Sequence, residues 1–208
     1  GSTQMTPDEV LAATQVAHFA GKHVAAHTGG AEGVEMAILN GVDTVEHCYS
    51  LDEKVSKMLA ESGVVCVPTL VVTDSISLYR EHGAKEFALK KLELAREYHR
   101  RSFQLVLNAG ARFAVGSDLP SAKVQGVIAT VREMEIMVEL GAHPMMVIKG
   151  ATALPAELCG LEDVVGTLKE DRVADLLVVE GCPCQDMKVL ENPTAIMKDG
   201  QWIKNVIS

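Results

Sequence analysis

Three side chains that can bind a metal ion stand at the ends of short apolar segments. They are His27 after the segment 22–27 (KHVAAH), His47 after 44–47 (TVEH) and Asp118 after 112–118 (RFAVGSD). The carboxyl ends of parallel strands in an α/β barrel form one face, so side chains far apart in the sequence converge there. One buried histidine on a strand is more often a hydrogen-bonded core residue than a ligand. Three such strand ends in one chain favour a shared cation site.

Helical and strand patterns alternate along the part of the chain that carries these residues. Helices are predicted at 7–21, 33–40, 51–62 and 84–108, and buried strands at 22–27, 44–47, 64–69 and 112–118. Thr6 and Pro7 open the first helix as N-cap and first helical residue, and Gly110 ends the long one. This alternation is typical of βα units with a parallel sheet.

The last third of the chain changes character. Helical patterns continue at 125–140 and 144–158. Apolar segments at 174–180 and 195–203, the second broken by the turn pair Asp199-Gly200, then predict two or three antiparallel strands. The sequence therefore predicts an α/β fold of about four βα units with a small antiparallel β appendage.

The residues around the strand ends resemble the amidohydrolase superfamily of metal-dependent hydrolases. The stretch VAAHTGGAEGVEMAILNGVDTVEH resembles the family's fifth and sixth barrel strands, and GSD at 116–118 resembles the eighth. The tail ATALPAELCGLEDVVGTLKEDRVADLLVVEGCP resembles the family's closing segment. The similarity runs from Met5 to Trp202 and is strongest to the imidazolonepropionase-like and Xaa-Pro dipeptidase-like branch.

The resemblance implies a fold and a division into domains. Residues 1–160 would form the C-terminal half of a (β/α)8 TIM-type barrel, equivalent to strands 5 to 8. Residues 161–208 would form the C-terminal part of a small β-sandwich domain.

The resemblance also implies roles for the three strand-end residues. His27 and His47 would bind the more buried of two metals, zinc or another divalent ion, or lie beside it, and Asp118 would bind the other metal and act as the catalytic base. Imidazole and carboxylate suit zinc, and a catalytic zinc site keeps a position open for water, whose pKa falls to about 7. Asp118 would take a proton from that water and pass it to the leaving amine.

The family also uses a His-x-His motif from the first strand, and this chain contains none. Four strands cannot close an eight-stranded barrel, and they would leave open sheet edges. We expect these edges to be covered by the missing N-terminal half or by a second copy of the chain in a homo-oligomer.

Two further residues are candidates for contacting substrate. Tyr49 could polarise a carbonyl group or be a loop aromatic, and Thr69 ends the strand at 64–69, where threonine is also common for its β propensity. Glu46 is expected to face the helices or to form a salt bridge, because it points to the face of the strand opposite to His47. No catalytic role is assigned to the remaining histidines, which are His18, His23, His82, His99 and His143.

Composition limits the partners. A net charge of -9 argues against nucleic acid or an anionic membrane, and the basic cluster at 96–101 is expected to be a solvated helix face. Five cysteines without framework spacing fit reduced thiols, and no apolar run approaches a membrane span, so a cytoplasmic protein is expected.

Three functions remain open at this point. The first is metal-dependent hydrolysis of an amide bond in a small-molecule substrate such as a dipeptide, an N-acyl amino acid or a cyclic amide. The second is an inactive fragment or dimeric half-barrel that binds metal weakly or not at all. The third is deamination of a ring amidine by a mononuclear site, with His47 turned toward the substrate.

Overall fold

The computed structural model describes residues 3–119 and 126–205. The chain divides into two compact units, Gly1–Asp118 and Leu119–Ser208. This division places the helices after residue 119 with the C-terminal strands. The domain boundary expected after residue 160 concerns the family's barrel and sandwich domains, and it stays a prediction.

The first unit is built on a parallel sheet whose strand order is β1-β2-β3. The strands are β1 (Ala25–Gly30), β2 (Thr44–Ser50) and β3 (Val65–Val67). The parallel α/β arrangement agrees with the prediction, but β1 and β2 each run three residues beyond the predicted ends, to residues 30 and 50. His27 and His47 therefore lie inside their strands, because Gly30 still pairs with Ser50 beyond them.

The predicted fourth strand at 112–118 is not a regular strand. It joins β3 through one bridge between Cys66 and Phe113, with hydrogen bonds from Cys66 N to Arg112 O (3.0 Å) and from Ala114 N to Cys66 O (2.9 Å). The segment then leaves the sheet. Asp118 has a φ of 44°, outside the extended region that a regular strand occupies.

The two faces of this sheet are different. Val45, Cys66 and Phe113 are register partners on one face, and each is at most 4% exposed. The Phe113 ring contacts Phe103 of α6 (Glu86–Ala109) edge to face at 5.2 Å, so this face carries the hydrophobic core. Paired residues of parallel strands share a face, so His27 and its partner Glu46 lie together on the other face.

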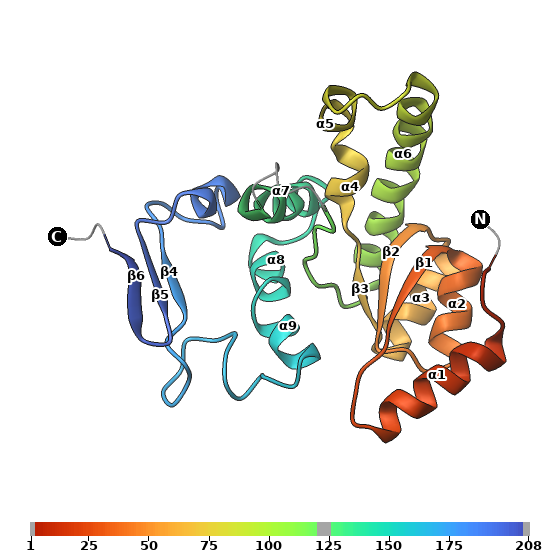
Figure 1. Cartoon of the computed structure of the whole chain (residues 1–208), viewed down its shortest axis with the longest axis horizontal. Helices are drawn as coiled ribbons and strands as arrows, with labels where there is room; N and C mark the ends of the chain where they lie inside the picture. Colours follow the sequence, from red (N-terminus) through yellow and green to blue (C-terminus); the bar gives the residue numbers. More distant parts are fainter. Residues whose placement is uncertain (1–2, 120–125, 206–208) are drawn as a thin grey trace. The chain divides into compact units, whose positions relative to one another are not determined.

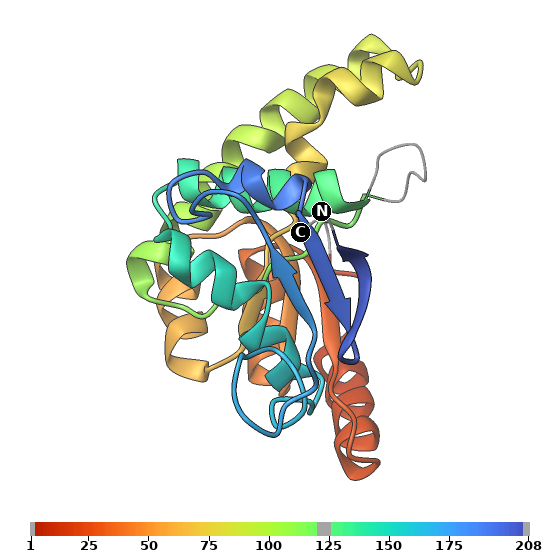
Figure 2. The same cartoon turned by 90° about the vertical axis from the view of Figure 1, so that its left-hand side faces the viewer.

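In the described part of the first unit, six helices accompany this sheet (Figures 1 and 2). They are α1 (Pro7–Phe19), α2 (Ala31–Leu39), α3 (Glu53–Ser62), α4 (Leu70–Asp74), α5 (Ile76–Glu81) and α6. Four of them match the predicted helices within about two residues, and Gly110 ends α6 in the left-handed region, with a φ of 73°. The sequence pattern predicts no helix at 70–83, where the structure has α4 and α5. In both views α5 and the first turns of α6 extend beyond the sheet.

The second unit contains helices and an antiparallel sheet. Its elements are α7 (Gly126–Glu139), α8 (Pro144–Gly150), α9 (Ala153–Leu158), a 3-10 helix (Met187–Glu191), β4 (Leu176–Val178), β5 (Ala195–Lys198) and β6 (Gln201–Asn205). The strands pair antiparallel in the order β4-β5-β6, as predicted. Position 125 of the predicted helix 125–140 lies outside the described residues.

The helix predicted at 144–158 is interrupted, and the reason is local. Thr152 has a ψ of -81°, and α9 begins after it. Pro155 cannot donate a hydrogen bond, and its ring would clash with the Ala151 carbonyl in a continuous helix. Two short helices therefore replace one.

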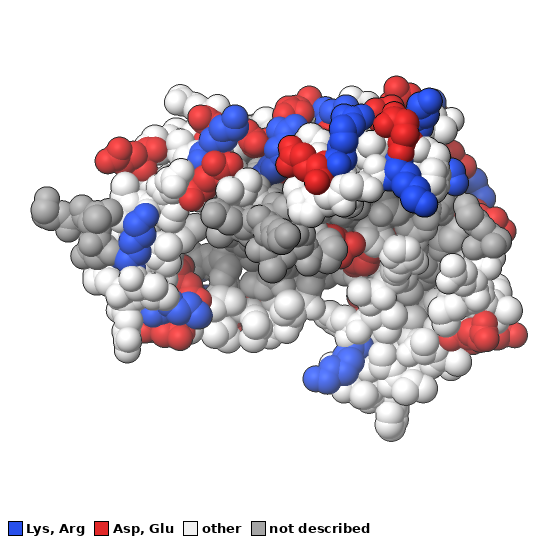
Figure 3. All heavy atoms as spheres, turned by 45° about the horizontal axis from the view of Figure 1, so that its top comes forward, with Lys and Arg blue, Asp and Glu red and all other residues white. Residues whose placement is uncertain are grey.

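Charged side chains of both signs are interspersed on the face drawn in Figure 3. Among the helices in the described ranges, none has the length and hydropathy needed to cross a lipid bilayer.

Gly116 lies where the segment that leads to Asp118 passes close to β3. A Cβ at this position would lie 2.6 Å from Val67 Cγ1, and valine is stiff at χ1. We predict that Gly116→Ala lowers the free energy of unfolding by about 1–3 kcal/mol, measured by urea denaturation. The loss should be smaller in a Val67→Ala background, because that substitution removes the clashing methyl group.

Gly33→Ala is the matched control, since an added Cβ there meets nothing within 4 Å and alanine favours helix in α2. It should leave stability unchanged or raise it. Equal losses for Gly116→Ala in the wild-type and Val67→Ala backgrounds would contradict the contact.

Candidate active site

Left-handed backbone occurs at the strand ends of the first unit. The φ angles are 71° at His47, 52° at Cys48, 54° at Thr69 and 44° at Asp118. Residues with a Cβ rarely adopt this conformation, and each such position costs of order 1–3 kcal/mol. Strain of this kind persists where surrounding contacts fix it, and it is concentrated at functional sites. Three of these four residues belong to the predicted site.

The two predicted histidines and the predicted aspartate lie together. The His27 and His47 rings contact edge to face, with centroids 4.4 Å apart. His47 Nε2 lies 4.0 Å from Asp118 Oδ2. His47 is buried, whereas His27 and Asp118 are exposed. The structure thus brings together residues 91 positions apart in the sequence.

Thr69 contacts His47. The threonine is 3% exposed, and its Oγ1 lies 2.8 Å from His47 Nδ1. When Nδ1–H donates to this hydroxyl, Nε2 keeps its lone pair and faces Asp118. This bond supports a role for Thr69 in orienting His47, and the substrate contact predicted for Thr69 stays a prediction.

Tyr49 packs between two histidines. Its ring stacks on His47 at 5.2 Å and an interplanar angle of 2°, and it meets His99 edge to face at 4.7 Å. Burial raises the pKa of Tyr49, and the negative charge of Asp118 raises it further. The same two causes raise the pKa of Tyr79 on α5, so this second phenol, not anticipated from the sequence, also lies within the field of Asp118.

Glu46 differs from the prediction that it faces the helices. Its carboxylate accepts a hydrogen bond from Thr44 Oγ1 (2.6 Å), and its register partner is His27. Burial raises its pKa, the Thr44 hydroxyl opposes the increase, and the charge of Asp118 adds to it. The predicted alternation of side chains is confirmed, since Glu46 and Val45 face opposite sides of the sheet. The side that faces the helices, however, is that of Val45.

Burial also controls the protonation of His47. It lowers the pKa of this imidazole, and nearby His27 lowers it further, against the opposing effect of Asp118. The neutral ring is the form that can ligate a metal.

Two polar residues of α6 complete the surroundings of His47. His99 is 0% exposed, and its Nε2 lies 2.9 Å from His47 O. Ser102 is 2% exposed, and its hydroxyl donates to Cys48 O at 2.5 Å. Their i, i+3 spacing on a predicted helix was visible in the sequence, but nothing there indicated what this face would meet.

A cavity of about 470 Å³ adjoins these residues at the ends of β1 and β2. The ranges 29–31 and 49–52 line it, so Tyr49 belongs both to the histidine cluster and to the cavity wall. The volume is sufficient for a small-molecule ligand.

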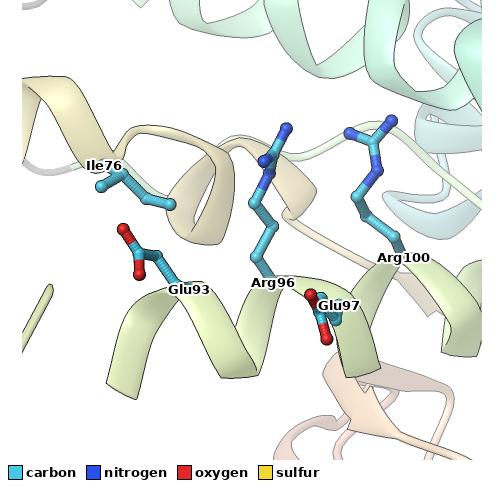
Figure 4. Close-up of a pocket in the computed structure, with 5 residues that line it drawn as sticks. All are labelled: Ile76, Glu93, Arg96, Glu97 and Arg100. Atoms are coloured by element: carbon cyan, nitrogen blue, oxygen red, sulfur yellow. The ribbon is translucent and has the colours of Figure 1, made fainter. Parts of the chain in front are cut away.

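A second cavity, of about 420 Å³, contains charged residues of α6 (Figure 4). Arg96 and Arg100 extend from α6 in the same direction, and both contact Asp74 Oδ1, at 2.6 and 3.1 Å. Glu93 and Glu97 also line this cavity. The basic groups of this cavity are thus balanced by carboxylates. The basic cluster at 96–101, which was expected to be a solvated helix face, forms in part an ion-pair network that fixes α4 to α6.

The donor set suits a metal ion but is incomplete within the described residues. His47 offers Nε2 beside a carboxylate, and its other nitrogen has a hydrogen-bond partner, as metal-binding histidines usually do. In the described ranges, no three histidine, cysteine or acidic side chains are close enough together to hold an ion. Any metal held here would need further ligands.

Parallel strands whose ends carry histidine and aspartate define an α/β fold of the kind that supports hydrolases. Comparison with known families assigns the chain within that class. Residues 1–208 match the amidohydrolase family, so the chain belongs to it.

Similar proteins agree with this assignment. Ochratoxinase from Aspergillus niger is 29% identical over 195 residues, covering 93% of this chain and 40% of the relative. A crystal structure of a Xaa-Pro dipeptidase with bound methionine is 32% identical, with a TM-score of 0.87, covering 98% of this chain and 50% of the other. A putative prolidase from Bifidobacterium longum is 28% identical, with a TM-score of 0.85 and coverages of 99% and 53%. The chain thus spans about half the length of the proteins it matches.

The buried His99 predicts a specific acid sensitivity. Burial lowers its pKa from 6.5 to about 4, so between these pH values the unfolded chain binds a proton that the folded chain does not. His99 therefore contributes a fall in the free energy of unfolding as pH falls through this window, of up to about 1.4 kcal/mol per pH unit.

His99→Gln should remove this one-proton slope in chelator-treated protein, measured by urea denaturation at several pH values between 4 and 6.5. The exposed histidine variant His82→Gln is the control and should keep the wild-type slope. Identical slopes in wild type and His99→Gln would contradict the assignment.

Proposed function

We propose that this chain carries part of the active site of a metal-dependent hydrolase that cleaves an amide bond in a small molecule. The observation that supports it most is the approach of His47 Nε2 to Asp118 Oδ2, with His27 in ring contact with His47. Membership of the amidohydrolase family gives the reaction class.

His27, His47 and Asp118 would hold zinc or another divalent cation. Such a cation supplies a bound water with a pKa near 7 and polarises a carbonyl group. Thr69 fixes the orientation of the His47 ring, and burial keeps that ring neutral and able to ligate. Asp118 lies beside His47 and is also exposed, so its carboxylate can exchange protons with a substrate.

Asp118 is the proposed proton carrier. Its carboxylate accepts a proton from the attacking water, and the same oxygen then delivers this proton to the leaving nitrogen. The Tyr49 hydroxyl, like any phenol, is protonated at neutral pH, and burial and the Asp118 charge raise its pKa further, so it can donate a hydrogen bond to a substrate carbonyl oxygen.

The proposed substrate class is a dipeptide or N-acyl amino acid. Support comes from relatives described as a Xaa-Pro dipeptidase and a putative prolidase, and from the small volume of the cavity beside Tyr49. A cyclic amide fits the same chemistry. Deamination of a ring amidine is the alternative for a mononuclear site, with His47 turned to the substrate.

We further propose that β1, β2, β3 and the segment 112–118 correspond to four consecutive strands of an eight-stranded barrel. The parallel order and the pairing of Phe113 with Cys66 support this arrangement. The open edges would be covered by an N-terminal half or by a second copy of the chain.

Asp118→Asn tests the proposed base. The substitution removes the proton acceptor, and we expect kcat to fall by about 10²- to 10⁴-fold in full-length protein supplied with zinc. The assay is a panel of dipeptides, N-acyl amino acids and cyclic amides. Because Asp118 is exposed, thermal stability should be nearly unchanged.

Asp8→Asn, an exposed aspartate on α1, is the control and should retain wild-type activity. A panel without turnover, or an active Asp118→Asn enzyme, would remove the proposal. Release of ammonia instead of an amino acid would favour the deaminase.

Metal analysis of the 208-residue chain alone tests how much of the site it contains. With His27, His47 and Asp118 as its only proposed ligands, we expect less than one zinc per chain after dialysis, measured by atomic emission. About two metals per chain would show that the ligands supplied here suffice for the complete site.

A further inference from the structure

The α6 helix makes two buried polar contacts with the backbone beside the proposed site. His99 Nε2 lies 2.9 Å from His47 O, and Ser102 Oγ lies 2.5 Å from Cys48 O. The Ser102 hydroxyl also accepts a hydrogen bond from Leu51 N at 3.1 Å. Ser102 thereby links the residues before and after the end of β2.

These contacts fall on the backbone that most needs support. His47 and Cys48 are consecutive residues with φ angles of 71° and 52°, a conformation that residues with a Cβ avoid. Both of their carbonyl groups accept from α6. Without these donors, two buried carbonyls would lose hydrogen bonds at the point where the chain is most strained.

His99 has one tautomer that satisfies its surroundings. A carbonyl oxygen can only accept, so Nε2 must carry the hydrogen that bonds His47 O. In the neutral ring Nδ1 then accepts from Thr73 Oγ1, which lies 3.0 Å away. Thr73 Oγ1 also lies 3.1 Å from Leu70 O, so its hydroxyl hydrogen can be shared between that carbonyl and His99 Nδ1.

The helix that presents these groups is itself anchored. Asp74 follows Thr73 at the end of α4, and its carboxylate binds Arg96 and Arg100 on the turns of α6 adjoining His99. α4 thus fixes both the ring of His99 and the position of the helix that carries it.

We propose that His99 and Ser102 are positioning residues that hold the left-handed backbone of His47 and Cys48 and so aim the His47 imidazole at the proposed cation site. The inference rests on the proposed function, because it assigns a purpose to the direction of His47 Nε2. The inference goes beyond the proposed function because it assigns a role to two residues of α6, a helix that supplies no metal ligand.

The variants separate this role from general stability. His99→Phe removes both ring hydrogen bonds, and His99→Gln keeps an amide donor that can reach His47 O. Ser102→Ala removes one buried hydroxyl. Its matched control is Ser56→Ala, because Ser56 is 1% exposed and its hydroxyl also donates to a backbone carbonyl, that of Asp52, at 2.7 Å.

Two readouts report on His47 without requiring turnover. The first is the pair of ¹⁵N chemical shifts of the His47 ring in metal-free full-length protein. The second is the affinity for Co²⁺, followed by its visible absorption. His99→Phe should alter the shifts and lower the affinity about tenfold or more, as loss of groups that orient a ligand usually does. Ser102→Ala should change both readouts in the same direction.

Ser56→Ala should lower the melting temperature without moving either readout, and His99→Gln should restore most of the affinity. Unchanged shifts and affinity in both Ser102→Ala and His99→Phe would overturn the proposal. If His99→Phe fails to fold, the comparison of Ser102→Ala with Ser56→Ala decides alone.

The outcome is distinguishable from a failure of the proposed function. If the wild-type protein cleaves no substrate but the variants alter the His47 chemical shifts, the positioning role is retained and the hydrolase proposal is rejected. If the wild-type enzyme is active but the variants keep normal His47 shifts and normal Co²⁺ affinity, the hydrolase proposal is retained and the positioning role is rejected.

Discussion

The first unit depends on a backbone conformation that its sequence does not favour. Three residues have positive φ angles although each carries a Cβ: His47 within β2, Thr69 shortly after β3, and Asp118 after the segment that is bridged to β3. A regular strand would send alternate side chains to opposite faces and carry the chain straight on. The left-handed turn interrupts that alternation, so His47 is directed toward Asp118, while Val45 remains in the core. The site and the hydrophobic core are therefore built from the same short strands.

Such a conformation has to be stabilised by contacts around it. The Thr69 hydroxyl holds the His47 ring, the His99 ring and the Ser102 hydroxyl hold the adjoining carbonyls, and Tyr49 packs on His47 from the side. Burying these polar groups is costly unless each finds a partner, and their hydrogen bonds are made to one another. The charge of Asp118 extends across the same region, since it raises the pKa of Glu46, Tyr49 and Tyr79.

The sequence predicted the parallel α/β fold and most helix positions because apolar periodicity and capping residues are local signals. It also indicated His27, His47 and Asp118, because the strand before each of them is apolar and ends in a ligand-type residue. It missed α4 and α5, which are short and lack caps from side chains. The contacts of His99 and Ser102 could not be foreseen, because they join residues more than 50 positions apart and depend on how α6 packs. The side to which Glu46 turns was missed for a related reason: alternation gives two faces but does not say which one the helices cover.

The double ion pair of Asp74 has a consequence for how this region can vary in length. It fixes α6 at Arg96 and Arg100, and the backbone of β2 is held by His99, between these two arginines, and by Ser102, two residues after the second. One residue inserted into a helix rotates everything after it by about 100° and moves it about 1.5 Å along the axis. An insertion between Arg96 and Ser102 would therefore turn the serine hydroxyl away from the strand, whereas the turn at 82–85, where the chain reverses between α5 and α6, can absorb added residues without disturbing either contact. The length of the chain can therefore change at the turn between α5 and α6, whereas residues between Arg96 and Ser102 can be substituted but not inserted or deleted.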